Sequence, residues 1–171
     1  MIRNAIRAIS LDVDFYNAVE VDRSLTAQAG IVVVIASALN GVGSAVALDD
    51  VSIIAAVLGA MATGLVGWLL WSAAAYLIGT RVFGGATTFG AVLRVIGFTF
   101  APLAFGVIPW LGVPAAGWML VAAVIAFREG LNIGTKSAIG TMTLGWGLWL
   151  GTTLVLNVLL DLELSARWPF P

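Results

Sequence analysis

Few residues of this chain are of the types that perform acid–base or metal chemistry. Its 171 residues include no cysteine and no histidine. The thiol nucleophile, the commonest general base and the commonest metal ligands are therefore missing. Carboxylates come close together in sequence at Asp49–Asp50 and at Asp161 with Glu163. Both clusters end apolar runs, and we interpret them as loop residues. The sequence predicts a protein that is not an enzyme and has no cofactor and no metal site.

Basic side chains form a second candidate site. Four of them flank apolar runs: Arg81, Arg94, Arg128 and Lys136. Long basic side chains at the ends of membrane helices extend to the interface, which explains most of this placement. The same side chains would suit the headgroups of anionic lipids. We predict lipid headgroup contact at these four residues. A net charge of −1 offers no basic field for nucleic acid.

The elements that carry these residues are predicted to be membrane-spanning helices. Apolar residues make up 61% of the chain and charged residues 10%, against about 45–50% and about 25% in soluble domains. Uncharged runs cover 24–48, 51–80, 95–127 and 137–160. About 20 apolar residues cross a bilayer as a helix, and no run alternates as a barrel strand would. The fold class is an all-α polytopic membrane protein.

The run between Arg94 and Arg128 is too long for one span. As a single helix its 33 residues would reach about 50 Å, against a hydrocarbon core of about 30 Å. Three prolines interrupt it: Pro102, Pro109 and Pro114. Because proline removes a helical hydrogen bond, we predict a hairpin of two short spans. The total becomes five transmembrane helices.

The first 23 residues are predicted to lie outside the spans. Ile2, Ile6 and Ile9 recur at helical spacing, with Arg3 and Arg7 elsewhere round the turn. This pattern is typical of a helix in the membrane interface. A helix packed against the ends of the spans is equally compatible. We divide the chain into an N-terminal amphipathic segment, a membrane domain and a short outer tail, over 1–23, 24–160 and 161–171.

The basic residues also predict the orientation. Cytoplasmic loops of membrane proteins are enriched in lysine and arginine. With five spans and a cytoplasmic N-terminus, seven of the eight lysines and arginines are cytoplasmic and only Arg167 is outside. The acidic loop residues then lie outside. The C-terminus is predicted to be outside as well.

One segment of the hairpin resembles a known family. Gly97-Phe98-Thr99-Phe100-Ala101-Pro102, after the turn Gly84-Gly85-Ala86-Thr87-Thr88-Phe89 and an arginine, is similar to the motif that opens the third span of Yip1-family proteins. The resemblance extends over roughly 11–160. From the residues themselves, Pro102 and Thr99 predict a kink. A hinge or a ligand-facing break in the helix is the alternative.

The resemblance implies a five-span bundle with a cytoplasmic N-terminus. Eukaryotic members work in vesicle trafficking, contact prenylated GTPases and shape membranes. This chain has a short N-terminal segment without a long acidic extension, and so looks more like the short prokaryotic members. We therefore expect it in the cytoplasmic membrane of a prokaryote. The fold is carried over here, and the trafficking activity is not.

Small and aromatic residues are paired on helix faces. Gly147 and Gly151 are four apart, and Trp146 and Trp149 are three apart. Small residues let helices approach closely. Packing within the bundle is one interpretation of these four residues, and self-association or a partner subunit is the other. Asn157, near the end of the last run, suits an interhelical hydrogen bond or a substrate contact.

Two functions follow from these observations. The first is a non-enzymatic scaffold, membrane-organising protein or accessory subunit. Its partners would be the lipid bilayer, other membrane subunits or a second copy of itself. The second is a small transporter or channel that uses the proline-broken third and fourth spans. It requires Thr99, Asn157 or both to face a water-filled cavity.

Overall fold

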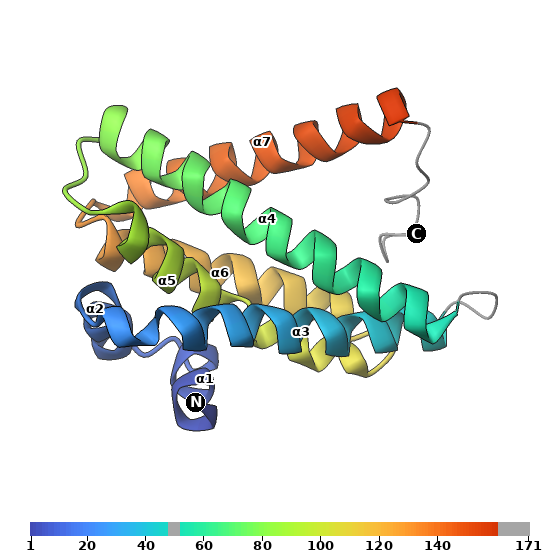
Figure 1. Ribbon diagram of the computed structural model, residues 1–171. Helices are drawn as coiled ribbons and strands as arrows, with labels where there is room; N and C mark the ends of the chain where they lie inside the picture. Colours follow the sequence, from blue (N-terminus) through green and yellow to red (C-terminus); the bar gives the residue numbers. More distant parts are fainter. Residues whose placement is uncertain (48–51, 161–171) are drawn as a thin grey trace.

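The computed structural model describes residues 1–47 and 52–160, without the side chains of Trp149 and of 152–160. This part of the chain is all helical (Figure 1). In chain order its elements are α1 (Ile2–Ile9), α2 (Val13–Val21), the 3₁₀ helix η1 (Arg23–Leu25), α3 (Thr26–Ala47), α4 (Ile53–Arg81), α5 (Phe89–Thr99), the 3₁₀ helix η2 (Ala101–Val107), α6 (Gly112–Gly130) and α7 (Thr135–Leu160).

Four helical stretches within the described residues are long and apolar enough to cross a membrane. They are Arg23–Ala47, Ile53–Arg81, Phe89–Val107 and Gly112–Gly130. The all-helical multi-pass class predicted from composition is confirmed. α7 is a helix of 26 residues but is not among the four stretches. The fifth span therefore stays a prediction.

The predicted hairpin is present, with one difference. The third stretch (Phe89–Val107) and the fourth (Gly112–Gly130) are joined by a short turn at 108–111. The third stretch begins at Phe89, so Arg94 lies inside a helix and does not mark its boundary. The helix starts early because the Thr88 side chain caps it, accepting a hydrogen bond from the Ala91 N–H at 3.3 Å.

The third stretch changes from α-helix to 3₁₀ helix at the proline. α5 ends at Thr99, and Pro102 occupies the first turn of η2, where its missing N–H removes no helical bond. The Thr99 hydroxyl donates to the carbonyl of Ile96 at 2.7 Å. The family motif therefore marks a break in helix type inside a continuous apolar stretch.

The bundle has two distinct ends. The basic end carries α2, the loop 82–88 and the loop 131–134, and the far end carries the turn 108–111 and the last residues of α3 (Figure 1). Every described lysine or arginine lies at the basic end or on α1. The acidic clusters at 49–50 and 161–163, Arg167 and the predicted tail lie outside the described residues, as does the side chain of Asn157.

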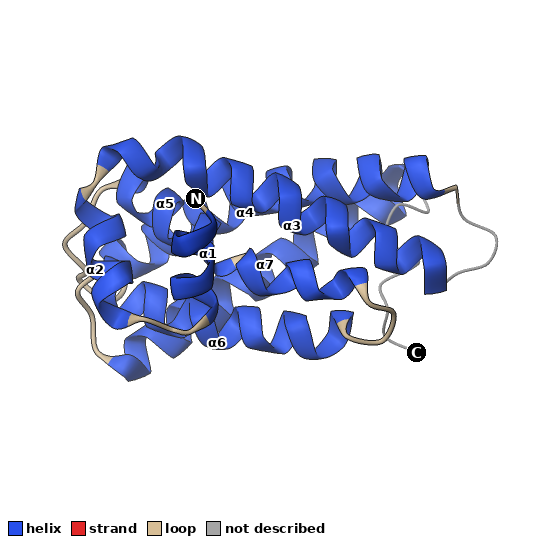
Figure 2. Ribbon diagram, turned by 90° about the horizontal axis from the view of Figure 1, so that it is seen from below, coloured by secondary structure: helices blue, strands red, loops and turns tan. Residues whose placement is uncertain are grey.

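α1 runs across the direction of the bundle. It projects sideways in Figure 1 and is seen almost end-on in Figure 2, which is turned by 90°. α1 meets the bundle at a point set back from the basic end. The chain then continues through α2 toward that end (Figure 1). The N-terminal segment (residues 1–22) therefore forms a bent arm, with α2 at the basic end and α1 against the side of the helices.

Candidate lipid-contact site

Arg94 fixes α2 on the bundle. Its side chain is buried (5% exposed), and its Nε donates to the carbonyl of Val19 at 3.0 Å while Nη2 donates to the carbonyl of Glu20. Both carbonyls belong to the last turn of α2 and have no helical partner of their own. A cation at a helix C-terminus is also favoured by the helix dipole. Arg94 thus caps α2 from another helix.

Aromatic packing holds the other side of α2. The rings of Phe15 and Phe98 meet edge to face with centroids 5.0 Å apart. Tyr16 is fully buried, and its hydroxyl donates to the carbonyl of Ala8 at 3.4 Å. Burial raises the pKa of the Tyr16 hydroxyl above its ordinary value. α2 is therefore part of the core, in contact with both α1 and the third stretch.

The corner between α1 and α2 is stabilised by one carboxylate. Asp12 accepts from the Phe15 N–H at 3.0 Å as the N-cap of α2, and from Arg7 Nε at 2.6 Å. These bonds lower the pKa of Asp12, and the Asp12 carboxylate raises the pKa of Arg7. Leu11 turns the chain with a φ of 58°. The bend between α1 and α2 is therefore stabilised by interactions within residues 7–15.

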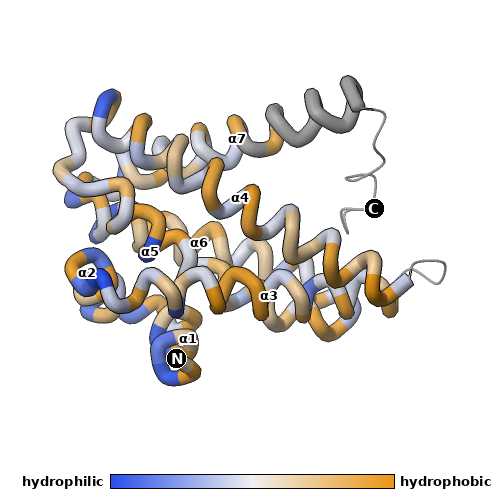
Figure 3. Tube along the Cα trace, in the orientation of Figure 1, coloured by the Kyte–Doolittle hydropathy of each residue, from blue (hydrophilic) through white to orange (hydrophobic). Residues whose placement is uncertain are grey.

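α1 presents an apolar surface that the rest of the described chain leaves exposed. Ile2 is 74% exposed and Ile6 57% exposed. Figure 3 shows that the two flanks of α1 differ in hydropathy, with the hydrophilic flank toward the basic end. Near its last residue α1 is attached to α6, because Trp118 Nε1 donates to the carbonyl of Ile9 at 2.8 Å. An amphipathic helix is thus held across the bundle.

The four predicted basic residues have different surroundings. Arg81 and Lys136 are exposed at the basic end, and Arg128 Nε pairs with Glu129 at 2.6 Å. Arg94 is buried and points its guanidinium at α2. Lipid contact at these positions stays a prediction. The exposed side chains of Arg81 and Lys136 are the most accessible to a lipid headgroup.

A carboxylate lies beside these basic residues. Glu20 on α2 accepts from Asn132 Nδ2 at 3.3 Å, which connects α2 to the loop before α7. Partial burial raises the pKa of Glu20, while Arg94 and Asn132 act in the opposite direction. The basic end therefore combines partnered carboxylates, such as Glu20 and Glu129, with the exposed side chains of Arg81 and Lys136.

The remaining family-motif residue lies at a helix contact. A Cβ on Gly97 would stand 2.8 Å from the Cβ of Ala29 and 3.2 Å from its carbonyl oxygen. Only glycine lets α5 approach α3 this closely. Thr99 is fully buried and its hydroxyl is satisfied by the backbone. In this structure, Gly97 and Thr99 serve packing.

The glycine pair of α7 has open space around it. No described atom lies within 4 Å of a Cβ built on Gly147 or on Gly151, whereas Gly145 faces the ring of Trp71. Trp146 is half-buried against the core, and the side chain of Trp149 lies outside the described residues. The space beside the glycine pair is therefore open within the described chain, and its role as a partner face stays a prediction.

Tryptophans deep in the spans fill the core. Trp68 Nε1 donates to the carbonyl of Leu93 at 2.8 Å, and the Trp71 ring meets Phe127 edge to face at 5.8 Å. Trp110, in the turn at the far end, is 87% exposed. This exposed position is typical of an interfacial anchor.

Some contacts of the site were not predicted from the sequence. The Thr88 and Asp12 caps have a local signal, a hydroxyl or carboxylate residue just before an apolar helix. The Arg94–Val19 and Trp118–Ile9 bonds join residues 75 and 109 apart, for which no local pattern exists. No group of three or more potential metal ligands occurs among the described residues.

Comparison with known protein families gives one match. The Yip1 domain matches residues 15–159 of the chain. The chain belongs to the Yip1 family. Yip1 proteins are membrane proteins and are generally non-enzymatic. No curated protein and no solved structure matches this chain. The Yip1 match begins at the buried Phe15, so it includes most of α2 and leaves α1 outside.

Proposed function

We propose that this Yip1-family chain is a membrane-organising protein that acts through helix packing and lipid contact. The observation that carries the proposal is α1, an amphipathic helix held across the spans with Ile2 and Ile6 exposed. A helix of this kind inserts its apolar face into the headgroup boundary of one leaflet. Because α1 is attached to the bundle, its insertion would be coupled to the spans.

We place the basic end in the cytoplasm. The concentration of described lysine and arginine at that end supports this orientation. α7, with 26 helical residues, would be the fifth span and would place the C-terminus outside. The location would be the cytoplasmic membrane of a prokaryote.

In this arrangement α1 acts as a wedge in the cytoplasmic leaflet. Adding area to one leaflet favours curvature toward it, and binding of such helices depends on curvature. Arg81 and Lys136 are exposed on the same side of the membrane and would contact anionic headgroups. The bonds of Trp118 and Arg94 to the arm would keep the wedge at a fixed depth.

Vesicle reconstitution tests this role. The purified chain is incorporated into vesicles of phosphatidylcholine and phosphatidylglycerol at increasing protein-to-lipid ratio, and vesicle diameters are measured by cryo-electron microscopy. Wild type should reduce the diameter, and Ile2→Glu with Ile6→Glu should abolish the effect. Asn17→Glu, on an exposed position of α2, is the control for added charge. Equal diameters for wild type and the double variant would disprove the wedge.

The transporter alternative gains no support from Thr99. Its side chain is fully buried, and its hydroxyl already donates to Ile96. An accessory role is compatible with the wedge, because the glycine pair of α7 leaves a face open to another subunit. Native mass spectrometry of the protein extracted in mild detergent would identify fixed companion subunits.

A further inference from the structure

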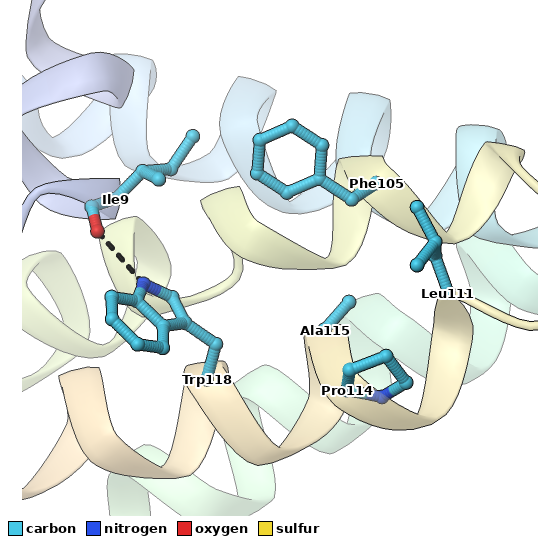
Figure 4. Close-up of a pocket in the computed structure, with 6 residues that line it drawn as sticks. All are labelled: Ile9, Phe105, Leu111, Pro114, Ala115 and Trp118. Carbon is cyan, nitrogen blue, oxygen red and sulfur yellow. Dashed lines mark hydrogen bonds between the residues drawn. The ribbon is translucent and has the colours of Figure 1, made fainter.

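A pocket of about 330 Å³ lies between α1, η2 and α6 (Figure 4). Its lining consists of Ile9, Phe105, Leu111, Pro114, Ala115 and Trp118. Five of these residues belong to the hairpin of the third and fourth stretches, and Ile9 comes from the end of α1. The size falls at the lower end of the range for small-molecule pockets, about 300–1,000 Å³.

The pocket opens to the side of the spans. Phe105 is 50% exposed and Trp118 46% exposed. Figure 4 shows the rings of Phe105 and Trp118 on facing helices, with Ala115 next to Trp118 along α6 and Leu111 near the turn. α1 borders the opposite end through Ile9. The opening thus faces the surroundings of the helices and not an aqueous end of the bundle.

Among the described residues, the lining has no free polar side-chain group to offer a ligand. The only polar side-chain atom among the six residues is Trp118 Nε1, which already donates to the carbonyl of Ile9 (Figure 4). A buried water needs about 2–4 polar partners, and an apolar cavity without them stays dry. An empty cavity leaves its walls without dispersion contacts. A hydrocarbon is the occupant that fits.

We propose that this pocket holds one acyl chain of a phospholipid. The neighbours of a side opening in membrane-spanning helices are lipid chains. The hydrophilic flank of α1 faces the basic end (Figure 3), so a phospholipid can place its headgroup beside that flank and its chain below α1 in the pocket. The inference rests on the proposed lipid contact and names the group bound.

The bound chain would also support the arm. Ile9 takes part in both the pocket and the hydrogen bond that attaches α1 to α6. Filling the space between Phe105 and Trp118 would fix the indole ring and hence the end of α1. Lipid binding and the position of the wedge are then coupled through Trp118.

Lipid retention measured by native mass spectrometry tests the site. The full chain is purified in dodecyl maltoside and mixed with palmitoyl-oleoyl phosphatidylglycerol or, separately, with palmitate. We expect one phospholipid per chain to survive detergent removal. Ala115→Phe fills the pocket and should lower retention about tenfold, the effect of removing roughly two buried methylene groups. Ala62→Phe, at an exposed position of α4, should leave retention unchanged.

Further variants separate the possible outcomes. Phe105→Ala removes a half-exposed wall without adding bulk, so its retention should fall even if the Ala115 variant does not fold. Equal retention in wild type and Phe105→Ala, or retention of palmitate without phospholipid, would overturn the proposal. Ile2→Glu lies outside the pocket and should retain lipid. If the pocket variants retain lipid as wild type does, but Ile2→Glu still alters vesicle diameter, the acyl-chain site is wrong and the insertion of α1 as a wedge still holds.

Discussion

Arg94 shows how a single charge is accommodated inside an apolar helix. The last turn of α2 contains no basic residue of its own, and its final carbonyls would otherwise lack partners. Arg94 donates from two nitrogens to neighbouring carbonyls, Val19 and Glu20. A planar guanidinium suits such a pair of acceptors better than the single ammonium of lysine. The side chain is therefore a connector between the arm and the spans.

Arg94→Gln should release α2 from the bundle. Hydrogen bonds to charged groups contribute about 1.5–3 kcal/mol each, and we expect a loss of unfolding free energy of this order. Thermal unfolding in detergent and tryptic cleavage at Arg23 would measure it. Arg94→Lys should be intermediate. The matched control is Arg81→Gln, at an exposed position, with an effect within about 0.5 kcal/mol. Equal behaviour of the two glutamine variants would contradict this role.

Asp12 makes the arm sensitive to acid. Its hydrogen bonds to Arg7 and to the Phe15 N–H lower its pKa below the ordinary 3.8. A group with a lowered folded-state pKa stabilises the fold above the unfolded value, and that stabilisation is lost as pH falls through the folded value. The corner between α1 and α2 should thus be ordered at neutral pH and loosen only below about pH 3.8.

Asp12→Asn isolates the charge, since asparagine is also a good N-cap. The chain lacks cysteine, so Ser10→Cys alone accepts a nitroxide label at the corner. In the Asp12 variant the label should already be more mobile at neutral pH, and its mobility should no longer depend on acid. Asp14→Asn, two residues further on, should retain the wild-type profile. Superimposable profiles for the two variants would rule out the Arg7–Asp12 contribution.

Helix α3 is the element against which the others pack. A side chain on Gly43 would overlap the carbonyl of Gly106 in η2, and a Cβ on Gly41 would stand 2.9 Å from the Cβ of Ala60 on α4. Such close approaches are the usual means of association between helices in lipid. The approach at Gly43 also holds the 3₁₀ helix η2 against α3.

Gly43→Ala should separate η2 from α3. Because backbone atoms of Gly106 occupy the space, the helices must move apart, and overpacking of this kind costs about 1–3 kcal/mol. Gly59→Ala on α4 is the control, since no described atom lies within 4 Å of its Cβ and alanine favours a helix by about 1 kcal/mol. The thermal unfolding temperature should fall for Gly43→Ala and rise or stay level for Gly59→Ala. The opposite order would contradict the packing described.

At the scale of the whole molecule, the glycine pair of α7 leads us to expect contact with another chain. Gly147 and Gly151 lie four residues apart with no described atom near their Cβ positions. A small-xxx-small pair allows close contact between helices of different chains. Self-association through α7 is therefore the oligomeric arrangement that we expect.

Gly147→Ile with Gly151→Ile should weaken that association. Energy transfer between donor- and acceptor-labelled chains in vesicles measures the apparent affinity of self-association. This affinity should fall about tenfold, equivalent to about 1.4 kcal/mol. Gly59→Ile, equally open on α4, adds the same bulk elsewhere and should leave transfer unchanged. Wild-type transfer in the double variant would show that copies do not meet through this face.

The sequence determined the class of the protein because that class depends on local quantities. The length of each apolar run, compared with the thickness of a bilayer, separates one span from two. Pro102 acts on its own helix turn, and the Gly97 to Pro102 motif is continuous in the chain. The hairpin, the family and the helical class were therefore predictable from neighbouring residues.

Only the tertiary structure decided what each polar residue does. Arg94 was assigned to a span boundary because charge usually ends an apolar run, yet its partners are 74 and 75 residues away on α2. The pocket likewise combines Ile9 with residues of the hairpin. The hydrogen bond from Trp118 to the Ile9 carbonyl joins residues 109 positions apart. Such sites depend on how separate helices pack against one another, and composition and spacing within one helix do not specify that packing.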